Sequence, residues 1–472
     1  MQHSIENENH SMLTTVREFA DSLAGSIITP DSVDYDEARG VWNGMIDRFP
    51  ALIVRCANAE DVAKTVKFAR NSNIPVSVRG GGHNVAGNAV LDYGLVIDLS
   101  EMQTVTVDPE NKIARAEGGA MIGHLDAATQ AHGLATPAGL MSETGIAGLT
   151  LGGGFSWLRR KYGLACDALI GAQLVTADGD IIEANAEENS DLLWGLKGGG
   201  GNFGVVTRFD YQLYDLGPDV YFVMQYLPTD KMREGLQFWN EWTKTAPDEV
   251  SSIAVLGYVV PSEEIPSEYH HQETLIFVAM YTGNPETGKE VLAPLANFTT
   301  PIVDFSATLP YIDVQQVFDE EFPSGEMHYY WKSRYLAKLD DNAIDTLIEL
   351  NAQSPSHHST LDIWQMGGAM SRIPATETAF GDRSAPFLLG IEANWEIGED
   401  DDANIAWTRN VYDTSAPFAT DRSYLNFPGF YEDAESMVDN AFGENMGRLR
   451  ELKKRYDPTN FFNRNQNIKP AE

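Results

Sequence analysis

In the stretch Pro75-Val-Ser-Val-Arg79-Gly80-Gly81-Gly82-His83-Asn84, a short apolar strand runs directly into three consecutive glycines. Glycine lacks a Cβ, so this loop can adopt positive φ angles and lets a ligand approach the backbone closely. Successive N–H groups in such a loop form a concave site for an anion such as a pyrophosphate. Arg79 and His83 at its edges favour a binding loop over a plain surface turn.

Alternating strands and helices flank this loop. We expect strands over residues 51–55, 75–79, 95–99, 104–107 and 113–117, and helices over residues 13–27, 58–69 and 121–132. This alternation predicts an α+β fold with mixed sheets. Beyond about residue 215 we expect longer strands over 221–227, 252–260 and 274–281, and helices over 230–243 and 342–353, followed by a last helix over 434–455. The longer strands predict a second domain, an antiparallel sheet covered by helices on one side.

Two further segments suit an extended polar ligand. Glycines alternate with apolar and small polar residues from Gly139 to Gly154, a pattern that suits backbone lying along a flat, phosphate-bearing molecule. Residues 463–467 carry four amide side chains, which offer both donors and acceptors. A structural turn is the alternative interpretation of each segment.

A third glycine-rich segment, Gly198 to Gly204, contains the pattern G-x-G-x-x-G. The dinucleotide fingerprint requires a strand before this pattern and a helix after it. Here a helix-like segment, 191–196, precedes the glycines and a strand-like segment, 205–211, follows them. The order is reversed, so we do not expect a Rossmann site.

The chain is strongly acidic, with 33 Lys and Arg against 69 Asp and Glu and a net charge of −36. This balance argues against a nucleic-acid partner and against binding to an anionic membrane surface. The acidic residues occur throughout the sequence, which suggests a protein adapted to a salt-rich cytoplasm, as in halophiles. An ordinary acidic enzyme is the alternative.

The cysteine content and the hydropathy pattern bear on location. Two cysteines, Cys56 and Cys166, are too few for a disulfide framework. Residues 1–15 show no apolar signal region, and the sequence contains no run of about 18 apolar residues. We therefore expect a soluble cytoplasmic protein without a membrane span.

Taken together, the motifs resemble the berberine bridge enzyme-like family of FAD-linked oxidases, in the vanillyl-alcohol oxidase superfamily. The matching segments are 79–84, 144–154, 160–163 with Asp167, 198–206, 424–426, 456–460 and 465–468. The resemblance implies a two-domain PCMH-type FAD-binding fold. Residues 1–215 would form the FAD-binding domain, with a core at about 46–215. Residues 216–419 would form the substrate domain, and residues 420–472 would complete the FAD domain.

The resemblance also implies a set of cofactor-binding residues. The family histidine that bonds covalently to the flavin matches His83. Some members add a second bond from a cysteine, but Met141 stands at that position, so we expect attachment through His83 alone. The residues expected to bind the cofactor are Arg79, Gly80, Gly81, Gly82, His83, Asn84, Ser142, Gly145, Gly148, Leu149, Gly152, Gly204, Val205, Asn426, Asn465 and Asn467.

The catalytic chemistry requires a group that takes a proton from the substrate. Tyr424 matches the family tyrosine that faces the flavin, and Lys332 is a candidate cation to stabilise its phenolate. Glu392, a carboxylate within the apolar strand-like segment 387–395, is the second candidate base. The sequence does not decide between Tyr424 and Glu392.

We accordingly expect an FAD-dependent oxidoreductase that takes a hydride from an alcohol, sugar or related small molecule and passes the electrons to oxygen or another acceptor. A flavin-tethering binding protein without turnover is the alternative. The negative charge favours a neutral or weakly charged hydroxyl compound over a polyanion. The side chains expected to suit such a substrate are Tyr329, Tyr330, Trp331, Trp364, Gln365 and Trp395, with a place in the core as the alternative.

Overall fold

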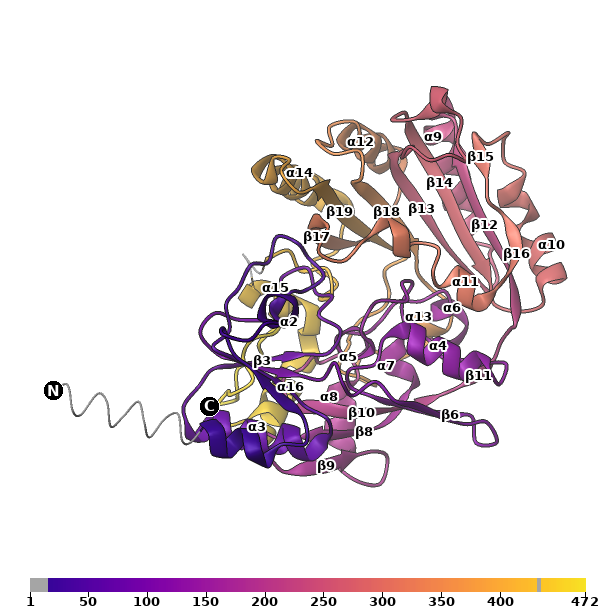
Figure 1. Cartoon of the computed structure of the whole chain (residues 1–472). Helices are drawn as coiled ribbons and strands as arrows, with labels where there is room; N and C mark the ends of the chain where they lie inside the picture. Colours follow the sequence, from indigo (N-terminus) through magenta and orange to yellow (C-terminus); the bar gives the residue numbers. More distant parts are fainter. Residues whose placement is uncertain (1–15, 431–433) are drawn as a thin grey trace.

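In the computed structural model, which describes residues 16–430 and 434–472, the first glycine loop leaves the edge of a four-stranded sheet (Figure 1). The strand order is β1-β2-β4-β3, with β2, β4 and β3 parallel and β1 antiparallel to β2. The elements are β1 (Ser26–Ile28), α2 (Tyr35–Arg39), β2 (Leu52–Arg55), α3 (Ala59–Asn71), β3 (Val76–Arg79) and β4 (Leu95–Asp98). The helix expected over 13–27 ends earlier, because residues 16–22 are helical and β1 follows; residues 13–15 lie outside the described part.

A second, five-stranded antiparallel sheet has the order β5-β6-β10-β8-β9. Its strands are β5 (Val105–Asp108), β6 (Ile113–Glu117), β8 (Leu169–Val175), β9 (Ile181–Ala184) and β10 (Val205–Gln212). The accompanying elements are α4 (Ile122–Gln130), α5 (Ile146–Leu151), α6 (Arg159–Tyr162), α7 (Ala165–Ala168), α8 (Ser190–Leu196) and the pair β7 (Leu134–Ala135) and β11 (Tyr214–Asp215). The third glycine segment joins α8 to β10, so the helix–loop–strand order expected from the sequence is confirmed.

The large sheet contains eight antiparallel strands. Its strands are β12 (Asp219–Leu227), β13 (Val250–Tyr258), β14 (Glu273–Tyr281), β15 (Val303–Asp304), β16 (Ala307–Pro310), β17 (Met327–Leu336), β18 (Thr360–Gln365) and β19 (Phe387–Glu396). The long helices beside it are α9 (Met232–Thr243), α10 (Pro285–Ala296), α12 (Asp341–Asn351) and α14 (Asp401–Thr414), and the shorter ones are α11 (Tyr311–Val314) and α13 (Ala369–Arg372). Figure 1 shows α9, α12 and α14 along one side of this sheet.

The two faces of the large sheet bury different residues because side chains alternate along a strand. Val223, Phe277 and Leu389 pack in one core cluster with α9, α10, α12 and α14. Their neighbours Met224, Val278 and Leu388 belong to a second cluster on the opposite face, together with residues of the N-terminal half. The helices therefore cover one face, as the sequence predicts, and the other face is directed toward the glycine loops.

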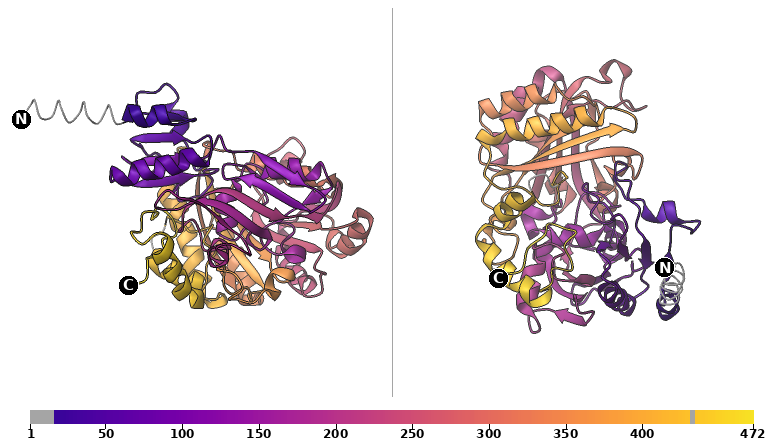
Figure 2. Two further views of the ribbon diagram at one scale, coloured as in Figure 1. Left: turned by 90° about the horizontal axis from the view of Figure 1, so that it is seen from below. Right: turned by 90° about the vertical axis from the view of Figure 1, so that its left-hand side faces the viewer.

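The C-terminal segment packs on the N-terminal half (Figure 2, yellow). The single helix expected over 434–455 is in fact two, α15 (Ala434–Phe442) and α16 (Met446–Tyr456), separated by Gly443 at a φ of 50°. The fully buried Lys453 anchors the segment: its Nζ donates to Asp457 Oδ2 at 2.7 Å, to the Asn202 carbonyl at 2.8 Å and to the Phe462 carbonyl at 2.9 Å. This contact holds the last residues against the third glycine segment.

Within the described residues, no helix is both long enough and apolar enough to cross a membrane.

Candidate active site

A cavity of about 350 Å³ lies between the glycine loops, the free face of the large sheet and the C-terminal segment. This volume falls within the usual range for small-molecule sites. The large sheet contributes residues from six strands in a row, β12, β14, β13, β18, β19 and β17, among them Tyr226, Val255 and Trp364. Three segments far apart in the sequence therefore meet at one site. The domain boundaries expected from the sequence stay a prediction.

The first two glycine loops cross in direct contact at one wall of the cavity. A Cβ on Gly81 would lie 2.5 Å from the Gly145 Cα, so neither position accepts a side chain without a shift of the backbone. At Gly148 and Gly201, which also line the cavity, a Cβ would have no protein atom within 4 Å. The absence of side chains at these two glycines leaves backbone open to a ligand.

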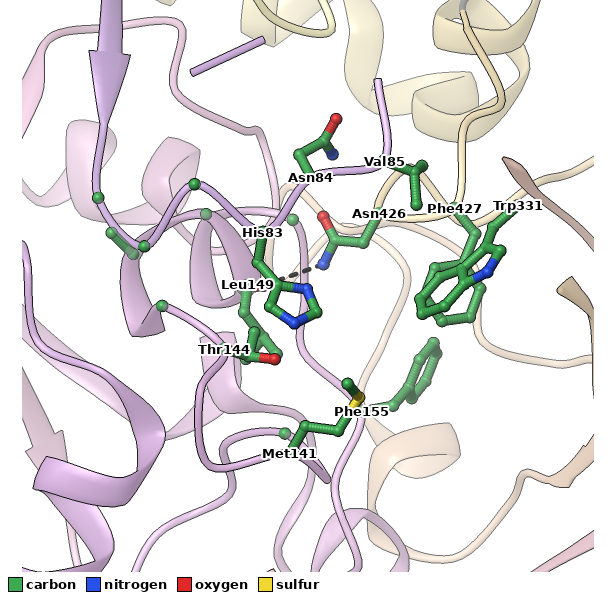
Figure 3. A pocket seen from close by; sticks show the side chains of 18 of the residues that line it. His83, Asn84, Val85, Met141, Thr144, Leu149, Phe155, Trp331, Asn426 and Phe427 are labelled. Carbon is green, nitrogen blue, oxygen red and sulfur yellow. Dashed lines mark hydrogen bonds between the residues drawn. The ribbon is translucent and has the colours of Figure 1, made fainter. Parts of the chain in front are cut away.

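His83 projects into the cavity from the first glycine loop (Figure 3). Its ring stacks on Trp42 with 4.2 Å between centroids, and Trp42 stacks in turn on Tyr329 at 3.7 Å. Burial lowers the pKa of His83 to about 4, so its imidazole is neutral near pH 7. Its Nε2 is buried and has no hydrogen-bond partner among residues 16–430 and 434–472. The ring is thus held rigidly with an unused nitrogen.

Tyr424 and Asn426 lie at the cavity wall next to the second glycine loop. The Tyr424 hydroxyl accepts hydrogen bonds from the Gly154 N–H at 3.1 Å and from Asn426 Nδ2 at 2.8 Å. Asn426 Nδ2 also donates to the Leu149 carbonyl at 3.2 Å (Figure 3, dashed). Burial raises the pKa of Tyr424 above its usual value despite these donors, so the phenol is protonated at neutral pH.

The expected role of Lys332 as a partner of this phenolate is wrong. Lys332 is on β17, next to the cavity-lining Trp331, and alternation turns its side chain to the other face of the sheet. There its Nζ lies 4.5 Å from the centroid of the Tyr412 ring on α14.

Three carboxyl groups also line the cavity: Glu321, Asp362 and Glu392. Burial raises the pKa of Glu392 well above its usual value, and the neighbouring Asp362 raises it further. Burial likewise raises the pKa of Asp362 above its usual range. Burial, and then Asp362, raise the pKa of Glu321 to about 7. Asp362 and Glu321 therefore titrate near neutral pH, where acid–base chemistry at an active site is most effective.

The structure brings most of the expected cofactor residues together. Those that line the cavity are Gly80, Gly81, Gly82, His83, Asn84, Gly145, Gly148, Leu149, Gly152, Gly204, Val205, Asn426 and Asn465. Arg79, Ser142 and Asn467 do not line it: Arg79 bonds to the Ala38 carbonyl, and Ser142 donates to the carboxylate of Asp319 from its N–H at 2.9 Å and from its hydroxyl at 2.5 Å. A role in binding FAD stays a prediction for each of these residues.

Of the side chains expected to suit the substrate, only Trp331 and Trp364 line the cavity. Tyr330 and Trp395 pack in the core on the helix-covered face, and Tyr329 stacks beneath Trp42. Gln365 is buried, and its amide donates to the Thr243 carbonyl. The alternation of strand residues explains most of this division.

Asp362 and Glu321 are not among the site residues expected from the sequence. Asp362 interrupts the apolar strand 360–365 in the same way as Glu392 interrupts its own strand, so the same signal was available for it. Glu321 lies in the short 3₁₀ turn Asp319–Glu321 within an acidic run, and no local pattern separates it from its neighbours. No cluster of metal-ligating side chains occurs within 16–430 and 434–472.

A sequence profile described as an FAD binding domain matches residues 50–185, and one described as berberine and berberine like matches residues 423–469. The FAD-linked oxidoreductase YgaK of Bacillus subtilis is 32% identical over 458 residues, which cover 95% of this chain and 97% of that protein. The chain belongs to the berberine bridge enzyme-like family of FAD-linked oxidoreductases.

Further relatives agree with this assignment. The (R)-6-hydroxynicotine oxidase of Paenarthrobacter nicotinovorans is 29% identical over 465 residues, covering 95% of this chain and 97% of that protein. The crystal structure of 6-hydroxy-D-nicotine oxidase from Arthrobacter nicotinovorans superposes with a TM-score of 0.85 at 28% identity, over 95% of this chain and 99% of that chain. The expected α+β PCMH-type fold is confirmed, and this oxidoreductase uses FAD and acts on a small molecule.

The residues present fit FAD. The cavity is lined by open backbone at Gly148 and Gly201 and by His83, whose Nε2 has no partner among the described residues. Buried Asn465 Oδ1 is a further polar atom without a partner in the described chain, and its residue lines the same cavity. A flat ligand with many donors and acceptors would satisfy these groups.

Proposed function

We propose that this oxidoreductase holds FAD covalently through His83 and oxidises a small hydroxyl compound at the face of the large sheet. In this reaction the substrate carbon loses a hydride and its oxygen loses a proton, which together convert an alcohol to a carbonyl. FAD, when bound, accepts the hydride. Oxygen or another acceptor then takes the electrons.

The state of the His83 ring is the observation that supports covalent attachment of FAD. Formation of a bond from an imidazole requires a neutral ring with a free lone pair, and burial keeps the His83 ring neutral. Its stacking on Trp42 fixes the direction of the ring, and Nε2 has no partner in the described chain. A ring held in this way is prepared for attachment to a ligand inside the cavity.

The sulfur-containing side chains near the site, Met141 and Cys166, do not offer a second attachment point for the flavin. Met141 lines the cavity (Figure 3), but its thioether has no ionisable thiol. Cys166 is fully buried in α7 and does not line the cavity, and burial raises its pKa well above the usual thiol value. A thiol in this state is unreactive.

We propose that Tyr424 is the catalytic residue that contacts the reacting hydroxyl. Two N–H donors already point at its oxygen, so its own proton remains for a bond to the substrate. Because this phenol is protonated at neutral pH, its first role is to orient the substrate oxygen. Glu392, a carboxyl that lines the same cavity and whose pKa burial raises, is then the second candidate for the proton acceptor.

The substrate that we propose carries no negative charge. The net charge of −36 disfavours anions around any entrance. Three of the groups that line the cavity are carboxyls, which adds to this effect locally. The sequence-based expectation of a neutral or weakly charged hydroxyl compound is retained on this basis.

A cytoplasmic location also stays a prediction, which cell fractionation would test.

Denaturing gel electrophoresis under ultraviolet light tests the covalent attachment. We expect flavin fluorescence to migrate with the wild-type protein and with Met141→Leu, which keeps an apolar side chain of similar size. The fluorescence should be absent from His83→Ala. Flavin that stays with denatured His83→Ala protein, or a wild-type protein that releases all of its flavin, would contradict the proposal.

A further inference from the structure

Asp362, Glu392 and Trp364 converge around a position that has no side chain. Asp362 on β18 pairs with Gly390 on β19. Trp364 lies two residues after Asp362 on β18, and Glu392 lies two residues after Gly390 on β19, so all of them are on the same face of the sheet. A Cβ on Gly390 would lie 2.9 Å from Glu392 Oε1 and 3.5 Å from both the Asp362 Cβ and Trp364 Nε1. The missing side chain therefore leaves a small recess in the sheet, which we call the Gly390 recess.

The Gly390 recess is lined by carboxyl groups whose ionised form burial disfavours. The carboxyls of Asp362 and Glu392 repel each other, and Glu321 faces the same cavity. Among the described residues that line the cavity, the permanently charged cation is Arg464, which belongs to the C-terminal segment. No cation lowers the pKa of any of the three carboxyls. A buried carboxylate without a cation is costly, and a positively charged ligand would remove that cost.

The recess also contains a donor that needs an acceptor. Trp364 is 7% exposed, and its Nε1 is buried without a hydrogen-bond partner in the part of the chain that the structure describes. Asp362 Oδ1 is likewise unpartnered. An indole N–H only donates, so it requires an oxygen or another acceptor from a ligand. Unpaired buried polar groups are rare in folded proteins, and here they lie beside each other in a cavity.

We propose that the Gly390 recess recognises a protonated amine on the substrate, with an adjacent hydroxyl oxygen accepting from Trp364 Nε1. The ammonium would donate to Asp362 and Glu392, and the aromatic ring of Trp331, which pairs with Glu392 across the strands, would support the cation. The substrate would then be a hydroxylated amine. This inference rests on the proposed function, because it assigns a substrate class to the same cavity.

Three matched compounds test the charge preference on the FAD-loaded protein. 2-Amino-1-phenylethanol, 1-phenyl-1,2-ethanediol and mandelate share a phenyl ring and a benzylic hydroxyl, and differ in one terminal group: ammonium, hydroxyl or carboxylate. Dissociation constants come from the ligand-dependent rise of the unfolding midpoint. We expect the amine to bind at least about tenfold more tightly than the diol, and mandelate not to bind.

Three variants assign the preference to the recess. In Asp362→Asn/Glu392→Gln the amine should bind no more tightly than the diol. In Trp364→Phe both compounds should weaken severalfold while their ratio is kept, because the hydroxyl oxygen is common to both. Glu396→Gln is the matched control, since Glu396 ends the same strand β19 with an exposed carboxylate. It should leave the dissociation constants of the amine and the diol unchanged.

The inference is overturned if wild-type protein binds the amine and the diol equally, if the preference survives in the double variant, or if the amine does not bind at millimolar concentration. Failure of the proposed function gives a different result. In that case the purified protein lacks covalent flavin, or no hydroxyl compound reduces its flavin, whatever the binding preference.

Discussion

At the residue scale, Tyr424 is the side chain whose removal separates binding from chemistry. Tyr424→Phe removes one hydroxyl, keeps the ring that packs 4.5 Å from Phe155 and leaves His83 untouched. We therefore expect unchanged FAD content and fold, with flavin reduction slowed by roughly 10²–10⁴-fold. Anaerobic stopped-flow absorbance near the flavin maximum measures this rate. An unchanged rate would transfer the role to Glu392.

Asp126 on α4 gives the fold a pH dependence. Burial raises its pKa to about 7, and its one hydrogen bond comes from Gln315 Nε2 at 3.0 Å. Between about pH 4 and pH 7 the folded state then binds more protons than the unfolded state, so this residue lowers stability as pH rises. Asp126→Asn should stabilise the protein more at pH 8 than at pH 5, with a difference of at most about 3 kcal/mol.

Urea unfolding at both pH values measures the effect of Asp126→Asn. The control is Asp313→Asn, an exposed substitution on α11, the helix that precedes Gln315. This control should change stability equally at pH 5 and pH 8. An equal change at the two pH values in Asp126→Asn would show that Asp126 is ionised in the folded protein.

At the element scale, one glycine in α5 and one in α16 provide a matched test of whether the open backbone in the cavity binds FAD. Gly148 in α5 lines the cavity, whereas Gly447 in α16 is exposed elsewhere, and a Cβ on either meets no protein atom within 4 Å. Alanine in a helix is favoured over glycine by about 1 kcal/mol, so neither Gly148→Ala nor Gly447→Ala should weaken the FAD-free protein. We expect Gly148→Ala alone to lose bound flavin, measured as flavin absorbance per protein. Equal flavin content in the two variants would contradict a contact between FAD and the backbone at Gly148.

The elements themselves were largely predictable from the sequence, and their contacts were not. The glycine loops and the strand patterns report local conformation, so β2, β3, β4 and β6 lie where the sequence places them, to within a residue. The Gly390 recess depends on the register of β18 against β19, which no local pattern contains. The break between α15 and α16 was missed because an amphipathic pattern continues across Gly443.

At the scale of the whole molecule, the net charge of −36 predicts a response to salt. Screening of the repulsion among surface carboxylates stabilises the folded state, so the unfolding midpoint should rise between dilute buffer and molar KCl. Sorbitol at equal osmolality is the control, because it stabilises without screening charge. A midpoint that does not rise beyond the sorbitol effect would remove the proposal of a halophilic protein.

The anchoring of the C-terminal segment by Lys453 has a consequence for biosynthesis. Phe462, Arg464, Asn465 and Gln466 line the cavity that the first glycine loop begins to form near residue 80. A ribosome must therefore add more than 380 residues after the first glycine loop before the last residues that line the cavity are made. The cavity can close only after the residues up to Gln466 have emerged, so a chain that ends before them should not hold the flavin stably.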